Sequence, residues 1–162
     1  MKLKIPAGPR VSATIRTSQI ITVALMLGVT VFGIIATVLA SKGPAKAPML
    51  AYVGVLVAVQ VVALRFFIPG LFLKTQLKSV KHSEAELVSE RLPSLYQTQL
   101  IIGLALLEGS AFFNLIAYLL EGNWFSLGIA GFMLALMAMM FPTGDRFEKW
   151  AEDLSQNLNS AF

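Results

Sequence analysis

Apolar and polar positions follow each other along this chain in long blocks. Four apolar blocks come close to or exceed the length of about 20 residues that an α-helix needs to cross the hydrocarbon core of a bilayer. Shorter polar segments separate them. The pattern predicts an all-α transmembrane bundle of four helices. The four blocks are residues 17–40, 48–68, 95–120 and 124–141.

Turn signals between the blocks pair the helices into two tandem hairpins. The first block ends before Ser41-Lys42-Gly43-Pro44, and the second runs into Ile68-Pro69-Gly70. Proline cannot donate a backbone hydrogen bond, so we expect the second helix to end there. Glu121-Gly122-Asn123 alone separates the last two blocks, which forces an antiparallel pair. Glu121, at the tip of that pair, should face water.

The predicted organisation is a single membrane domain over residues 1–162. Within the loop between the hairpins, Ser83-Glu84-Ala85-Glu86 has the composition of a helix start. The predicted segments are a basic N-terminal segment (1–16), a first hairpin (17–68), a cytoplasmic loop (69–94), a second hairpin (95–141) and an amphipathic tail (142–162).

Lysine and arginine positions predict the orientation. With Arg65 set aside as intramembrane, ten basic residues fall in the two terminal segments and the central loop, against Lys42 and Lys46 in the opposite loop. Basic loops resist translocation, so both termini should lie in the cytoplasm, in a bacterial inner membrane. The first block could also be a cleaved secretory signal, although a signal core is typically about 7–15 residues long.

Composition supports lipid as the solvent. The chain is 56 % apolar and 14 % charged, with a mean hydropathy of +0.73, whereas soluble domains are about 25 % charged. There is no cysteine and one histidine, His82, which argues against zinc, haem and iron–sulfur cofactors. The net charge of the chain is +4, and its basic residues flank the apolar blocks. They therefore indicate topology and contact with lipid headgroups rather than nucleic-acid binding.

An internal repeat relates the first and third blocks. A shift of 81 residues gives ten identities over 24 positions, among them Ala24 with Ala105 and Gly28 with Gly109. This pattern predicts a duplicated hairpin in parallel topology, which a cleaved signal would not mirror. Both pairs are also small-xxx-small motifs, so the first and third helices should pack closely. The alternative is that these small residues merely face lipid.

Glu108 lies in the middle of the third block. An ionised carboxylate there costs at least about 2.5–3.5 kcal/mol, so Glu108 is either a proton or ion site, a contact to a polar partner, or a neutral hydrogen-bonded group. Counted from the cytoplasmic side, Gln60 lies at the same depth of roughly 13 Å and could donate to it. Asn114 would add a polar site nearby. Arg65, at roughly 6 Å depth, should reach the headgroups instead of pairing with Glu108.

The tail places Phe147 and Trp150 on the apolar side of an amphipathic helix. That helix could lie in the headgroup region with both rings at the lipid interface. It could equally pack on the cytoplasmic end of its own bundle.

Residues 102–120, with Glu108 near their centre, resemble the carboxylate-bearing helix of the proteolipid c subunits of rotary ATP synthases. The resemblance implies that Glu108 is a proton or sodium site. In four-helix proteolipids the acid belongs to the fourth helix, whereas here it lies in the third. The overall pattern is also similar to small uncharacterised four-helix bacterial membrane proteins.

Three functions are compatible with these residues. The first is a non-enzymatic structural or accessory subunit that assembles with itself or with a larger membrane complex. The second is a proton- or ion-translocating component that uses Glu108, with Gln60 and Asn114 tuning it. The third, an enzyme acting on lipid or quinone, would need a nucleophile, metal cluster or acid–base pair, and the sequence indicates none.

Overall fold

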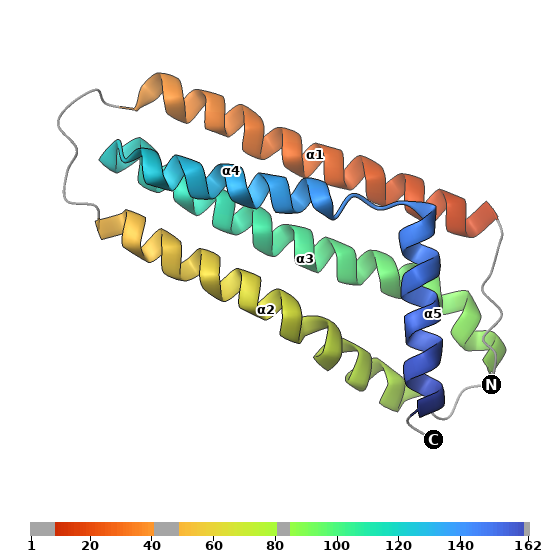
Figure 1. Cartoon of the computed structure of the whole chain (residues 1–162). Helices are drawn as coiled ribbons and strands as arrows, with labels where there is room; N and C mark the ends of the chain where they lie inside the picture. The colour runs from red at the N-terminus through yellow and green to blue at the C-terminus, as the bar shows by residue number, and fades with distance from the viewer. Residues whose placement is uncertain (1–8, 41–48, 81–84, 161–162) are drawn as a thin grey trace.

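The computed structural model describes residues 9–40, 49–80 and 85–160. These residues form α-helices and no strand, as the sequence predicts. Within this part of the chain, four helices run side by side and the fifth crosses one end of the bundle (Figure 1). The helices are α1 (Pro9–Leu39), α2 (Met49–Val80), α3 (Ala85–Glu121), α4 (Trp124–Met139) and α5 (Gly144–Ser160).

α1, α2 and α3 are longer than their apolar blocks at the end where α5 lies. α1 begins at Pro9, where the fixed φ of proline suits the first position of a helix. α3 begins at Ala85, within the predicted helix start, and continues through Pro93. α2 does not end at Ile68, because it continues through Pro69-Gly70 to Val80. The predicted break is wrong: one lost hydrogen bond does not stop a helix that neighbouring turns support, and membrane helices often tolerate proline.

Among the described residues, two helices are long and apolar enough to cross a membrane: α1 over Val11–Leu39 and α3 over Leu92–Glu121. α4 and the start of α5, Gly144–Leu154, are bent by 79° at a short break and would make a third span if counted as one. The described apolar part of α2, Met49–Leu64, is shorter. These helices mark the chain as a membrane protein.

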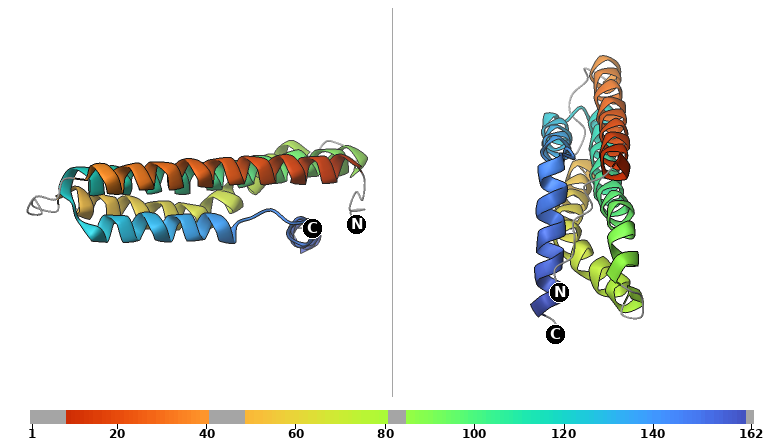
Figure 2. Two further views of the ribbon diagram at one scale, coloured as in Figure 1. Left: turned by 90° about the horizontal axis from the view of Figure 1, so that it is seen from above. Right: turned by 90° about the vertical axis from the view of Figure 1, so that its right-hand side faces the viewer.

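α3 is the central helix of the bundle. It contacts α1, α2 and α4, while α1 and α2 lie at opposite edges and share no extended contact (Figures 1 and 2). α1 runs parallel to α3, with the Phe32 and Phe112 rings 5.3 Å apart. The first two helices, expected to form a hairpin, therefore do not pack extensively on each other, whereas α3 and α4 pack as consecutive antiparallel helices.

The connection between α3 and α4 follows the expected local chemistry. Gly122 has φ = 67°, a left-handed conformation that ends α3. Its N–H donates to Tyr118 O at 2.8 Å. Asn123 then caps α4, because its side-chain oxygen accepts a hydrogen bond from Phe125 N at 3.0 Å.

The core lies along α3, between α1, α2 and α4. Aliphatic side chains of α3 fill its centre and two methionines of α4 close it. The buried residues of this cluster are Val29, Ala58, Val61, Leu100, Leu104, Leu107, Ala111, Leu115, Ala130, Met133 and Met137.

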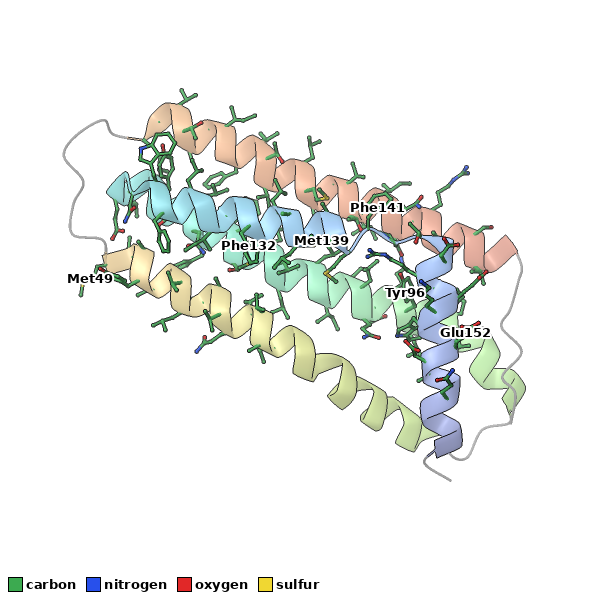
Figure 3. The ribbon with its side chains drawn as sticks, in the orientation of Figure 1. Met49, Tyr96, Phe132, Met139, Phe141 and Glu152 are labelled. Atoms are coloured by element: carbon green, nitrogen blue, oxygen red, sulfur yellow. The ribbon has the colours of Figure 1, made fainter. Side chains whose placement is uncertain are left out.

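α5 packs on its own bundle, the second of the two alternatives for the tail. Phe147 is 1 % exposed, and Leu154 is also buried against the start of α3. Tyr96 lies where α5 crosses the bundle (Figure 3), with its ring 5.3 Å from that of Phe147. Trp150, partly exposed, donates from Nε1 to Gln99 Oε1 at 3.1 Å.

Two further hydrogen bonds hold the bend between α4 and α5. Gln19 of α1 donates from Nε2 to Pro142 O at 2.9 Å. Arg146 of α5 donates to Met139 O, so a cationic side chain satisfies a carbonyl at the end of α4. The tail is therefore fixed to both neighbouring helices.

Candidate functional site

Asn114 joins α3 to α2 inside the bundle. Its side chain is fully buried, and Nδ2 donates to Gly54 O at 3.3 Å and to Ser110 O at 2.9 Å. A Cβ at position 54 would overlap Asn114 Oδ1. α2 can therefore come this close to α3 because Gly54 carries no side chain, as at many membrane helix contacts.

Glu121 holds the same two helices together at the far end of the bundle. Its carboxylate accepts hydrogen bonds from Leu50 N at 2.5 Å and from Ala51 N at 3.0 Å. These N–H groups belong to the first turn of α2, which has no intrahelical partner for them and favours a negative charge. Glu121 is 7 % exposed, so the expectation that it faces water is wrong.

Ser110, Asn114 and Glu121 form one stripe on α3, which we call the polar seam. Their spacing of four and seven residues places them on one side of a helix, and Asn114 and Glu121 show that this side faces α2. Ser110 Oγ and Asn114 Oδ1 are buried without a hydrogen-bond partner among the described residues. Sequence reasoning missed the seam, although its spacing was the signal that could have found it.

Glu108 lies on a different side of α3. It is six residues from Asn114, which is about 120° around the helix axis. Its Oε1 lies 3.9 Å from where a Cβ of Gly28 on α1 would be. The side chain is partly exposed, and no hydrogen bond or ion pair holds it within the described residues. The carboxylate therefore lies at the outer edge of the contact between α1 and α3.

Gln60 is at the level of Glu108 but faces elsewhere. Asn114 of α3 lies opposite Gly54 of the antiparallel α2, and six residues along each helix lead to Glu108 and Gln60. Gln60 is exposed on the outer face of α2. The three groups of the predicted ion site are not brought together, because Asn114 faces α2, Glu108 faces the edge of α1, and Gln60 faces outward.

The small-residue motifs lie around Glu108. α1 and α3 pack together as expected, and Gly28 lies beside Glu108 and Phe112. Ala24, Ala105 and Gly109 are exposed, and a Cβ at Gly109 would meet nothing within 4 Å. These motifs thus border the helix contact on its outer side. We call the surface formed by Ala24, Gly28, Ala105, Glu108 and Gly109 the Glu108 face.

The three residues expected at the lipid interface have different surroundings. Phe147 is buried against the bundle, and Trp150 is partly exposed beside Gln99. The side chain of Arg65 lies outside the described residues.

A shallow apolar groove of about 290 Å³ runs between α1 and α4 on the outer surface. Two of its threonines, Thr30 and Thr37, donate their hydroxyl groups to carbonyls of their own helix at 2.8 and 2.7 Å. The groove therefore presents hydrocarbon, as expected of a surface in contact with lipid.

Comparisons with protein-family models, with curated proteins and with solved structures find no match. Among the described residues, no group of three or more His, Cys, Asp or Glu side chains could hold a metal ion. The case for a function therefore depends on the Glu108 face and on the polar seam.

Substituting Gly54 by alanine should destabilise the chain by about 1–3 kcal/mol, because the added methyl group pushes Asn114 and α2 apart. Gly128→Ala is the matched control, since a Cβ there meets nothing within 4 Å. Unfolding in denaturing detergent measures the stability of both variants. Adding Asn114→Ala to Gly54→Ala should cost less than the sum of the two single changes. Additive effects would show that the two residues are not in contact.

Proposed function

We propose that this chain is a non-enzymatic subunit of a membrane assembly and that the Glu108 face is where it meets its partner. The observation that carries the proposal is a partly exposed carboxylate, without a partner in the described residues, beside the exposed small residues Ala24, Ala105 and Gly109.

Hydrocarbon offers no hydrogen bond to a carboxylate, so Glu108 facing lipid would cost at least about 2.5–3.5 kcal/mol if ionised. A neighbouring transmembrane helix removes this cost when it brings a donor to Glu108. The small side chains around Glu108 allow the backbone of such a helix to approach closely. A carboxylate that is buried and fully hydrogen-bonded would only stabilise the fold. Glu108 is neither buried nor hydrogen-bonded among the described residues.

In the proposed arrangement, α1 to α4 all cross the bilayer. α1 and α3 run parallel and α2 and α4 run back, which supports four crossings with both termini on one side. The excess of lysine and arginine at the α5 end favours the cytoplasm for that side, in a bacterial inner membrane. α5 then lies across the cytoplasmic end, with exposed Glu148, Lys149 and Asp153 toward water.

Gly109→Leu tests the proposed contact. The new side chain starts in open space, so the fold should remain, but it fills the Glu108 face. We expect the mass of the assembly in mild detergent to fall toward that of the single chain, as measured by analytical ultracentrifugation. Gly128→Leu, in equally open space on α4, should leave the mass unchanged. An unchanged assembly with Gly109→Leu would contradict the proposal.

A second candidate is a proton- or ion-translocating component in which Glu108 carries the ion. The partial exposure of Glu108 toward lipid supports it, because a carboxyl group in that position can react with an apolar carbodiimide. The orientation of Gln60 and Asn114, away from Glu108, favours the assembly role instead.

Glu108→Gln separates the two functions. An amide can still hydrogen-bond to a partner helix, so the assembly role predicts an unchanged mass in mild detergent. Ion translocation needs a group that gains and loses a proton, so the second candidate predicts loss of proton flux in reconstituted vesicles and pH-dependent carbodiimide labelling at Glu108. Intact assembly without proton flux in the unmodified protein would exclude the second candidate.

A further inference from the structure

Two polar side chains face outward at the same level from different helices. Gln60 is exposed on α2 and Glu108 is partly exposed on α3. Their common level follows from the contact of Asn114 with Gly54, because each lies six residues from that contact along antiparallel helices. Neither has a hydrogen-bond partner among the described residues. In hydrocarbon, each group needs one.

The two groups are complementary, but they cannot meet within one chain. The Gln60 amide has two N–H donors, and an ionised Glu108 carboxylate is an acceptor alone. α2 packs on the polar seam of α3, whereas Glu108 lies about 120° around that helix, beside Gly28 of α1. α1 and α2 stand at opposite edges of the bundle (Figure 2).

The residues around Gln60 and those around Glu108 also differ in the size of their side chains. On α2, exposed Leu56 (63 %) and Val59 (60 %) flank Gln60 and form a ridge of bulky side chains. In the Glu108 face, the four exposed residues beside the carboxylate are small: Ala24, Gly28, Ala105 and Gly109. A ridge of bulky residues on one surface fits a notch of small residues on the other.

We infer that copies of this chain assemble head to tail in the membrane, with the Gln60 ridge of one copy seated on the Glu108 face of the next. The Gln60 amide donates to the carboxylate of Glu108 in the neighbouring copy. Because both groups lie at one level, the copies share one orientation without a vertical shift. Such a heterologous contact repeats and can close into a ring. The inference depends on the proposed assembly function and names its partner.

The absence of cysteine from the sequence allows a direct test by disulfide cross-linking in native membranes. Two differently tagged versions, Gln60→Cys and Glu108→Cys, are produced together and oxidised. We expect a cross-linked dimer that carries both tags. Either version produced alone should give no cross-linked dimer, because position 60 of one copy meets position 108 of the next and only one of the two positions is then a cysteine. Val53→Cys is the control for Gln60→Cys: it is exposed on the same side of α2 but about 10 Å away along the axis, and should not cross-link to Glu108→Cys.

A second pair keeps both polar groups in place. Ala63 and Ala105 are exposed and lie at one level by the same count from Gly54 and Asn114. Co-produced Ala63→Cys and Ala105→Cys should therefore also give the mixed dimer. This pair tests the geometry if loss of Glu108 itself weakens the contact.

Each result has a distinct meaning. A dimer from Glu108→Cys alone would indicate a two-fold contact between identical faces and would overturn the inference. If neither pair cross-links while the protein retains a multimeric mass, the head-to-tail contact is wrong and the assembly function stands. If the unmodified protein has the mass of one chain, the inference and the proposed function both fail.

Discussion

Inside a bilayer, a polar group without a partner in its own chain must find one in another molecule. On the α2 side of α3, two polar groups find their partners within the chain: Asn114 donates to the Gly54 carbonyl, and Glu121 accepts from the first turn of α2. These two contacts fix the level and direction of α2 against α3. Everything inferred about Gln60 and Glu108 depends on that register, since it places both groups at one level along the bundle.

Different sides of α3 therefore contact different neighbours. The side that bears the polar seam binds α2, and neighbouring sides pack apolar residues against α1 and α4. The remaining side carries exposed Ala105 and Gly109, with Glu108 at its edge. A helix that contacts three neighbours and still presents a polar group at its free edge is suited to a fourth contact. We propose that the fourth contact comes from another subunit.

Sequence reasoning succeeded where the information is local or is measured along the chain. The apolar blocks locate the helices, Gly122 marks the tight turn, and counting residues puts Gln60 level with Glu108. It failed where direction around the helix axis matters, because that depends on which helices become neighbours. Glu121 illustrates the difference: its partners belong to α2, some 70 residues earlier in the chain, so the local sequence at a hairpin tip could not reveal them.

The mass of the unmodified protein, extracted in a mild detergent that retains native lipid, tests the assembly role most directly. Native mass spectrometry should give a multimer of the 17.6 kDa chain, alone or with partner subunits. A single chain with nothing but lipid bound would contradict the assembly role and would leave Glu108 exposed to hydrocarbon.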